Sequence, residues 1–173
     1  MFYNIFIRKL SHQMEKYEVL SLLLAAAIHD YDHPGYTNNF LIATADPLAI
    51  LYNDRSVLEN HHVASAWKLM MSEEEHQFLS EMEPEVINKV RVRTIDLVLS
   101  TDLTKHFDIL ADWKSHFDQQ GKVRLKNEKT RHTMMKMIIK FSDIANPAKE
   151  YQSHREWSKL VCEEFYTQGD KEK

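Results

Sequence analysis

The sequence predicts an all-α fold, and three observations support this class. Only three glycines and four prolines occur among 173 residues. No Asn-Gly or Asp-Gly pair marks a hairpin turn. Long stretches rich in Leu, Ala, Met, Glu and Lys carry apolar residues at spacings of three and four, the period of an amphipathic helix. We expect helices over residues 11–29, 37–44, 47–52, 57–71, 73–81, 85–100, 104–117, 128–142 and 154–167.

Cap residues and stop signals indicate where the helices in the first part of the chain begin and end. The first contains a Leu/Ala-rich run and stops before Pro34-Gly35, a pair that cannot continue a helix. Asn38 or Asn39 is a candidate cap for the short helix that follows. Ser56-Val57-Leu58-Glu59 has the form of a capping box at the start of the next long helix.

The later helices are bounded in the same way. An apolar run through residues 97–99 ends at Thr101-Asp102. The clearest loop, Gln119-Gln120-Gly121-Lys122, separates the two helices that follow, and Asn146-Pro147 ends the second of them. No repeat, low-complexity tract or domain-boundary linker interrupts the pattern, so we expect one helical unit.

Composition and charge argue against several function classes. The formal net charge is −4 and the basic residues form no stripe, which disfavours nucleic-acid binding. Cys162 is the single cysteine, so neither an internal disulfide nor a cysteine zinc site can form. No apolar stretch reaches the roughly 20 residues needed to cross a bilayer. We therefore expect a soluble, cytoplasmic protein without a membrane span.

Residues 28–62 carry the most informative pattern in the chain. Four of the ten histidines fall in this window, and His29-Asp30 is followed by His33 and later by Glu59. Imidazoles and carboxylates this close to an apolar run indicate a metal site, because a buried charge is costly unless it is paired or coordinates an ion.

Each of these residues also has a simpler structural explanation. His29 can interact with the end of its helix dipole beside a solvated Asp30. His33 can be a turn residue, and Glu59 is explained by the capping box. Of the adjacent pair His61-His62, at most one can face inward with Glu59.

Two more helix ends carry polar groups that could join such a site. Asp143 ends a strongly apolar helix, where it is either a cap or a ligand that points into the core, and Thr101-Asp102 occupies a similar position. There is no His-Glu-x-x-His motif, no phosphate-binding glycine loop and no Gly-x-Ser-x-Gly elbow. Histidine and carboxylates without cysteine suit a hydrolytic site in which one or two divalent ions activate water.

Five blocks in the same order resemble the class I 3',5'-cyclic nucleotide phosphodiesterases. They are His29-Asp30-Tyr31-Asp32-His33-Pro34-Gly35, residues 51–62, Thr101-Asp102-Leu103-Thr104-Lys105-His106, Ser142-Asp143-Ile144-Ala145-Asn146-Pro147, and Trp157 to Phe165 with Gln168-Gly169-Asp170-Lys171-Glu172. The resemblance covers roughly residues 17–173 and leaves 1–16 unmatched. It implies a compact multi-helix domain of the HD type, here a partial catalytic domain truncated at both ends.

The resemblance also implies a site with two divalent ions, Zn²⁺ and either Mg²⁺ or Mn²⁺. His29, Asp30 and Asp143 match ligands of the tighter ion, and Asp30 would bridge to the second. His33, Glu59 and Thr101 match residues that hold water on that second ion, and Glu59 can still cap its helix. The implied reaction is hydrolysis of a cyclic nucleotide by metal-activated hydroxide, in cyclic nucleotide signalling.

Four residues match the nucleotide pocket of that family. Asn146 matches the position that faces the purine, where an amide favours cyclic AMP, and Trp157, Ser158 and Val161 would lie near the same pocket. The implied partner is a cyclic nucleotide, and a homodimer is compatible with the resemblance.

Two family features are missing from the sequence. Family members carry a His-Asn-x-x-His-Ala-x-Asp-Val block before the His-Asp pair, which supplies the general acid and a further metal ligand. None of the 28 residues before His29 contains it, and His12 lies in a different setting. The family's purine-clamping Gln would lie beyond Lys173.

The sequence therefore leaves several interpretations open. The chain is either a central piece of an active phosphodiesterase or a catalytically inactive regulatory or interaction fragment. A different His-Asp hydrolase that acts on nucleoside triphosphates is a third interpretation, which the block at 53–62 disfavours. A helical binding module without chemistry is a fourth, and it predicts no bound metal.

Overall fold

The computed structural model describes residues 10–117 and 121–172, and within them it contains eight α-helices and no strand. The helices are α1 (Lys16–Ile28), α2 (Asn38–Ala43), α3 (Pro47–Leu51), α4 (Val57–Ser72), α5 (Pro84–Leu99), α6 (His106–Ser115), α7 (Glu128–Asp143) and α8 (Tyr151–Lys171). Four short 3-10 turns, η2 to η5, span Ser11–Gln13, Glu74–His76, Leu103–Lys105 and Asn146–Ala148. The all-α prediction is confirmed.

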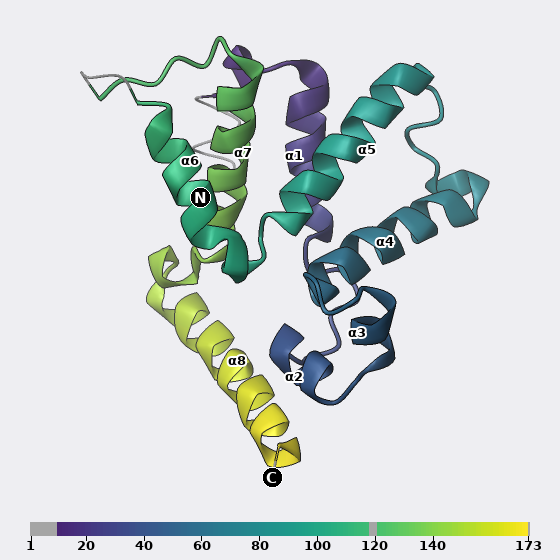
Figure 1. Cartoon of the computed structure of the whole chain (residues 1–173), viewed down its shortest axis with the longest axis vertical. Coiled ribbons are helices and arrows are strands. Elements are labelled where there is room, and N and C mark those ends of the chain that lie inside the picture. Colours follow the sequence, from purple (N-terminus) through teal and green to yellow (C-terminus); the bar gives the residue numbers. More distant parts are fainter. Residues whose placement is uncertain (1–9, 118–120, 173) are drawn as a thin grey trace.

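The main core forms around α1. This helix packs chiefly against α5 and also meets α4 and α7, while α6 lies along α7 (Figure 1). The buried side chains of this core come from α1, α4, α5 and α7, and they include Leu22, Ala25, Trp67, Val90, Leu97, Val98, Met135 and Ile139. Because α1 and α7 share this core, their C-terminal ends are held on the same side of the molecule.

A smaller core holds the segment between α1 and α4. Leu41, Ala49, Val57 and Leu58 are buried against one another, and Tyr36, Phe40, Leu48 and Tyr52 pack around them. The backbone in this segment turns sharply, with positive φ at Asp32 and Gly35 among other positions. The predicted Pro34-Gly35 stop therefore falls at a real change of chain direction.

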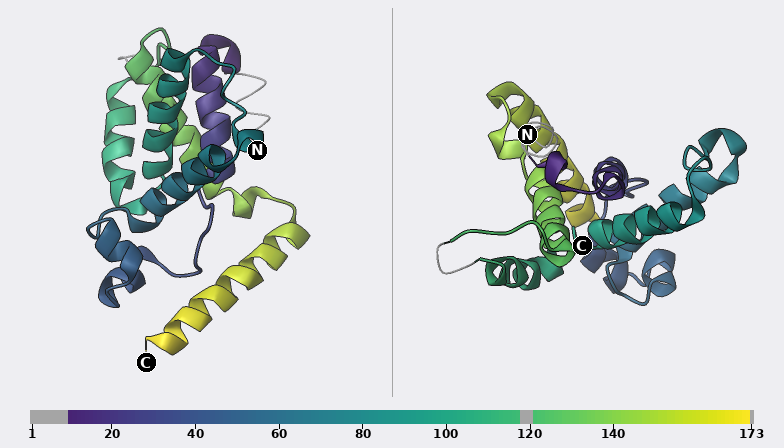
Figure 2. Two further views of the ribbon diagram at one scale, coloured as in Figure 1. Left: turned by 90° about the vertical axis from the view of Figure 1, so that its right-hand side faces the viewer. Right: turned by 90° about the horizontal axis from the view of Figure 1, so that it is seen from above.

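Helix α8 extends away from the bundle, as the views in Figure 2 show, and none of its residues is buried. Its far end returns to the segment before α2. Gln168 Oε1 accepts a hydrogen bond from the Thr37 backbone N–H at 2.9 Å, and the Lys171 ammonium lies 4.7 Å from the centre of the Tyr36 ring. Within the described residues, no helix is both long and apolar enough to cross a membrane.

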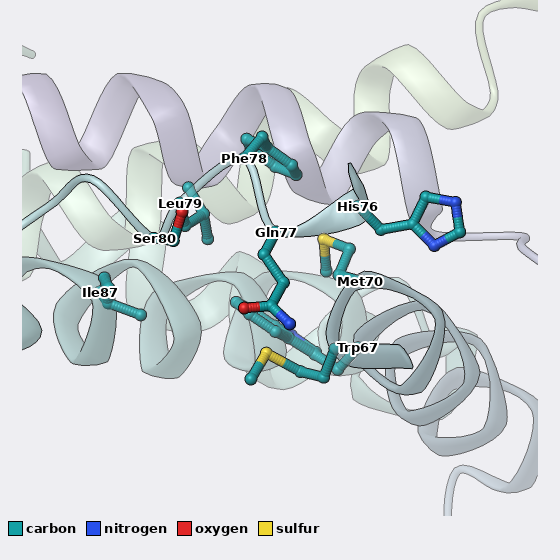
Figure 3. Close-up of a pocket in the computed structure, with 9 residues that line it drawn as sticks. Trp67, Met70, His76, Gln77, Phe78, Leu79, Ser80 and Ile87 are labelled. Carbon is teal, nitrogen blue, oxygen red and sulfur yellow. The ribbon is translucent and has the colours of Figure 1, made fainter. Parts of the chain in front are cut away.

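The predicted helix over 73–81 is wrong. Helix α4 ends at Ser72, and the segment that follows contains only the 3-10 turn η3 and further turns (Figure 3). Leu79 is the residue of this segment that reaches the core, at 6% exposure, while Phe78 remains exposed. A loop is enough to bury this one leucine, so the core does not require a helix over this segment.

Among the other helices, the first and the last differ most from their predicted bounds. The first long helix begins at Lys16 because Glu15 and Glu18 form a capping box there, and residues 11–13 form a separate 3-10 turn. Helix α8 is longer than the predicted 154–167 at both ends. Gly121, in the predicted loop, has a φ of +69°, and residues 118–120 lie outside the described part of the chain.

Candidate metal centre

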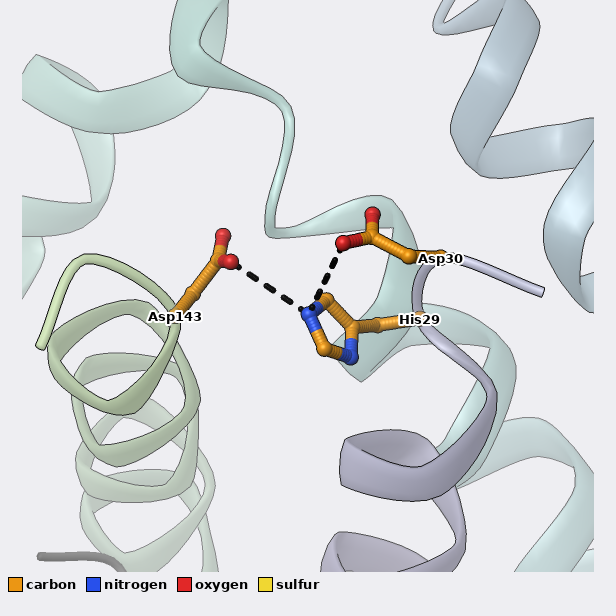
Figure 4. Close-up of side chains that lie close together, drawn as sticks. All are labelled: His29, Asp30 and Asp143. Atoms are coloured by element: carbon orange, nitrogen blue, oxygen red, sulfur yellow. Dashed lines mark hydrogen bonds and ion pairs between the residues drawn. The ribbon is translucent and has the colours of Figure 1, made fainter. Parts of the chain in front are cut away.

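The three predicted metal ligands lie at the ends of two helices that are far apart in the sequence. His29 and Asp30 follow directly after α1, and Asp143 is the last residue of α7. His29 Nε2 is 3.3 Å from Asp143 Oδ1 and 3.5 Å from Asp30 Oδ2 (Figure 4). One ligand atom from each residue lies within 4.8 Å of the others. The fold thus brings these three side chains together.

The chemistry and spacing of these donors fit a divalent ion. Zinc binds imidazole nitrogen and carboxylate oxygen at about 2.0–2.2 Å, so two ligand atoms at tetrahedral angles lie about 3.4 Å apart. Both distances from His29 Nε2 agree with that spacing. His29 Nδ1 lies 3.0 Å from the carbonyl oxygen of Ala26, and a hydrogen bond donated there leaves Nε2 free for an ion.

The charges around His29 favour its protonated form in the metal-free protein. The hydrogen bond to Asp143 raises the pKa of His29, the charge of Asp30 adds to the rise, and burial opposes it. A metal ion must displace this proton before it can bind Nε2. Proton and metal therefore compete for the same atom.

This competition predicts that zinc affinity increases with pH through and above pH 6.5, the ordinary histidine pKa. Because the folded pKa of His29 is raised, its proton still opposes binding above that pH. Zinc titrations between about pH 5.5 and 8 should show a gain that approaches about tenfold per pH unit at the acid end, as expected for one released proton, and that levels off once His29 has lost its proton. An affinity that stays constant across this range would show that His29 is not a ligand.

Of the three other histidines in residues 28–62, His62 approaches the cluster. His62 is 2% exposed, and its Nε2 lies 4.0 Å from Asp30 Oδ1. Burial lowers the pKa of His62, which keeps the ring neutral. The His33 ring stacks on His62 with centroids 5.4 Å apart, whereas His61 bonds Asp32 at 2.8 Å. Of the adjacent pair, His62 is therefore the inward-facing member.

The predicted capping box at Ser56 and Glu59 is wrong. Ser56 has a φ of +44°, and its hydroxyl donates to Asp102 Oδ2 at 2.6 Å rather than accepting from the helix. Asn38 caps α4 instead, because its Oδ1 accepts from the Leu58 N–H at 2.8 Å. A cap residue normally has extended backbone, and the left-handed conformation at Ser56 removes its side chain from the helix end.

Glu59 does not form the predicted capping box, and its carboxylate instead accepts a hydrogen bond from Asn38, the residue that caps α4. Asn38 Nδ2 donates to Glu59 Oε2 at 3.0 Å, and Thr37 rather than an asparagine caps α2. Burial raises the pKa of Glu59, while the amide of Asn38 opposes the rise. A carboxyl group with a raised pKa can exchange protons with water closer to neutral pH.

Replacement of Asn38 with Ala is expected to lower the free energy of unfolding by about 1–2 kcal/mol, because the first turn of α4 loses its cap. The matched control is Asn39→Ala, an exposed asparagine on the same helix, which should change stability by less than about 0.5 kcal/mol. Urea unfolding followed by circular dichroism measures both. Equal effects of the two substitutions would contradict the capping role.

Thr101 lies where α5 meets α7. Lys140 Nζ donates to the backbone carbonyl oxygens of Ser100, Thr101 and Asp102 at 3.0, 3.4 and 3.3 Å, respectively. Lys140 is 6% exposed, and burial lowers its pKa. Its amine therefore ties the helix end at Thr101 to the helix that carries Asp143. Thr101 and Asp143 also line one cavity of about 200 Å³.

The comparison with known sequences decides the family. All residues from 1 to 173 match the family described as 3'5'-cyclic nucleotide phosphodiesterase. The chain belongs to the 3',5'-cyclic nucleotide phosphodiesterases. The resemblance inferred from the five sequence blocks is confirmed.

Individual phosphodiesterases agree with this assignment. The cGMP-inhibited 3',5'-cyclic phosphodiesterase 3A of Mus musculus is 45% identical over 163 residues, which are 94% of this chain and 14% of that protein. The probable 3',5'-cyclic phosphodiesterase pde-3 of Caenorhabditis elegans is 44% identical over 161 residues, 93% of this chain and 23% of that protein. This chain thus spans less than a quarter of either relative.

A solved phosphodiesterase domain has the same fold. The domain from the RhoPDE fusion protein of the choanoflagellate Salpingoeca rosetta superposes with a TM-score of 0.85 at 31% identity. The match covers 92% of this chain and 50% of that chain. The predicted multi-helix phosphodiesterase fold is confirmed.

The predicted nucleotide-pocket residues lie in η5 and in the first half of α8. Asn146 Nδ2 is 3.0 Å from His154 Nδ1 and 3.4 Å from Ser158 Oγ. Trp157 is 54% exposed, with the Lys149 ammonium 5.7 Å from its ring centre, and Val161 is half-buried one turn farther on. Within the described residues, no hydrogen bond or ion pair joins this group to the metal ligands.

Sequence reasoning missed the roles of Lys140 and Asn38. Lys140 follows Thr133 by seven residues and Met137 by three, so it falls on the buried face of α7, and this helical period was a usable signal. Asn38 caps a helix that begins 19 residues later, and no local pattern predicts such a contact.

Proposed function

We propose that this chain forms the metal-binding part of a phosphodiesterase that hydrolyses 3',5'-cyclic nucleotides to 5'-monophosphates. The observation that carries the proposal is the convergence of His29, Asp30 and Asp143 in a chain of this family. The family match also supports a cyclic diester over a nucleoside triphosphate as the substrate. The unpaired Cys162 supports a reducing, cytoplasmic location.

The proposed site takes two divalent ions, Zn²⁺ and either Mg²⁺ or Mn²⁺. His29, Asp30 and Asp143 would hold the first, and Asp30 is exposed enough to reach a second. A bound ion supplies a water of lowered pKa and stabilises negative charge on the phosphate. His33, Glu59 and Thr101 are the proposed residues around that water, and the raised pKa of Glu59 supports a part for it in proton transfer.

Cyclic AMP is the proposed substrate because of the polar atoms that Asn146 offers. With Nδ2 directed to His154, its Oδ1 atom is buried and without a partner. A buried carbonyl oxygen favours a donor such as the 6-amino group of adenine over the 6-oxo group of guanine. Trp157, Ser158 and Val161 are proposed to line the same pocket.

The experiment uses an activated diester together with the natural substrates. Bis(p-nitrophenyl) phosphate has a leaving group that departs without protonation, so its hydrolysis tests the metal centre without requiring a general acid. The purified chain with Zn²⁺ and Mg²⁺ is expected to release p-nitrophenolate, and a chelator should stop the release. Parallel assays with cyclic AMP and cyclic GMP are expected to show a preference for cyclic AMP.

Two outcomes would count against the proposal. A rate no higher than that of the metal ions alone would overturn the catalytic role. Metal binding without hydrolysis of any diester would favour the alternative, a regulatory fragment without catalytic activity.

A further inference from the structure

One face of α8, near the C-terminal end of that helix, contacts the chain just before α2. The three side chains that make these contacts follow one another at spacings of four and three, the period of a helix. They are Glu164, which lies beside Gly35, Gln168, which bonds Thr37, and Lys171, whose ammonium lies over the ring of Tyr36. No residue of α8 is buried, and the helix extends away from the bundle (Figure 2). Polar contacts therefore contribute much of what holds its far end.

Gln168 makes two hydrogen bonds to Thr37. Its Oε1 atom accepts from the Thr37 backbone N–H at 2.9 Å, and its Nε2 atom donates to the Thr37 hydroxyl at 3.2 Å. Thr37 is also the cap of α2, because its Oγ1 atom accepts from the Phe40 N–H at 3.3 Å. Gln168 therefore holds both the backbone and the side chain of the residue at which α2 begins.

The next residue, Asn38, connects this anchor to Glu59. Its Oδ1 atom accepts from the Leu58 N–H at 2.8 Å, and its Nδ2 atom donates to Glu59 Oε2 at 3.0 Å. One carboxamide makes both bonds, so its position matters twice. A shift of the backbone at Thr37 would move the Cα of Asn38 and lengthen at least one of the two bonds.

We propose that Gln168 is a positioning residue, which acts through Thr37 and Asn38 to hold the Glu59 carboxylate at the metal centre. The inference rests on the proposed function, in which Glu59 lies beside the metal-activated water. A catalytic group must be held closely in its productive geometry, since a small displacement lowers the rate of the chemical step. Because α8 also carries Ser158 of the proposed nucleotide pocket, one helix would connect that pocket to the metal centre.

The test compares Gln168→Met with Gln152→Met. Each of these glutamines donates to the glutamate four residues later on α8 at 2.8 Å, but Gln152 is exposed and Gln168 also bonds Thr37. The first readout is hydrogen exchange at the Leu58 N–H in the metal-free chain, followed by nitrogen-15 correlated spectra. Exchange should be about five-fold faster in Gln168→Met, the factor that corresponds to one net hydrogen bond. Gln152→Met should leave it unchanged.

The second readout is hydrolysis of bis(p-nitrophenyl) phosphate by the zinc- and magnesium-loaded chain. Gln168→Met is expected to lower kcat roughly tenfold and to leave KM unchanged, because Glu59 acts in the chemical step. Equal Leu58 exchange in the two variants would overturn the proposal, and so would a change in KM with kcat unaltered. If the unmodified chain hydrolysed no diester, the proposed function would fail, while Leu58 exchange would still decide whether Gln168 positions Asn38.

Discussion

Replacement of Asp143 with Asn is expected to weaken zinc binding by at least about 100-fold. Loss of a residue that only orients a metal ligand already costs about 10- to 100-fold in affinity, and Asp143 is a proposed ligand itself. The substitution keeps the size of the side chain but removes its negative charge. Competition titration against a chelator of known affinity measures the change.

Asp112→Asn is the matched control for this substitution. Asp112 also lies beside a histidine, with His116 Nε2 3.7 Å from its carboxylate, but it is remote from the cluster. Its replacement should leave zinc affinity unchanged within about twofold. If both variants bound zinc like the unmodified chain, Asp143 could not be a ligand. Far-ultraviolet circular dichroism checks that both variants remain folded.

Replacement of Arg131 with Met is expected to have the largest effect on stability, about 3–5 kcal/mol. Arg131 Nε donates to Glu18 Oε2 at 2.8 Å, and the Glu18 side chain is fully buried. The substitution would leave a buried carboxylate without its counter-charge, which is far costlier than loss of an exposed pair. Because a domain of this size is stable by about 5–15 kcal/mol, this cost is a large fraction of the total stability of the chain.

Two comparisons isolate this effect in urea unfolding experiments. Arg93→Met breaks the ion pair with Glu128, which is 60% exposed, and should cost no more than about 1 kcal/mol. The double substitution Glu18→Met and Arg131→Met should recover most of the lost stability, because it removes the buried charge together with its partner. The account is contradicted if Arg131→Met costs no more than Arg93→Met.

The helices could be predicted wherever a local apolar period and a local stop signal agreed. The ends of α1 and α7 are such places, and both position the metal ligands. The structure of residues 73–81 could not be predicted from local signals. Leu79 is buried because it contacts the main core, and its neighbours in sequence do not indicate that contact. Tertiary contacts override local propensity at such positions.

In the candidate site, too, local sequence indicated some residues, whereas others depend on contacts between distant parts of the chain. The adjacent residues His29 and Asp30 could be proposed as ligands from their types and spacing. Asp143 lies 114 residues from His29, and it was joined to them through the family resemblance. The contacts of Asn38 and Lys140 also cross between helices, and the cap that Asn38 provides stands in place of the capping box that the local sequence around Ser56 suggested.

The position of a bound zinc ion tests the central claim most directly. A crystal of the chain grown with Zn²⁺, measured at the zinc absorption edge, gives an anomalous difference map that locates the ion. The expected result is a peak about 2.0–2.2 Å from His29 Nε2 and from one carboxylate oxygen each of Asp30 and Asp143. An ordered zinc peak elsewhere, with none between these three side chains, would contradict the assignment.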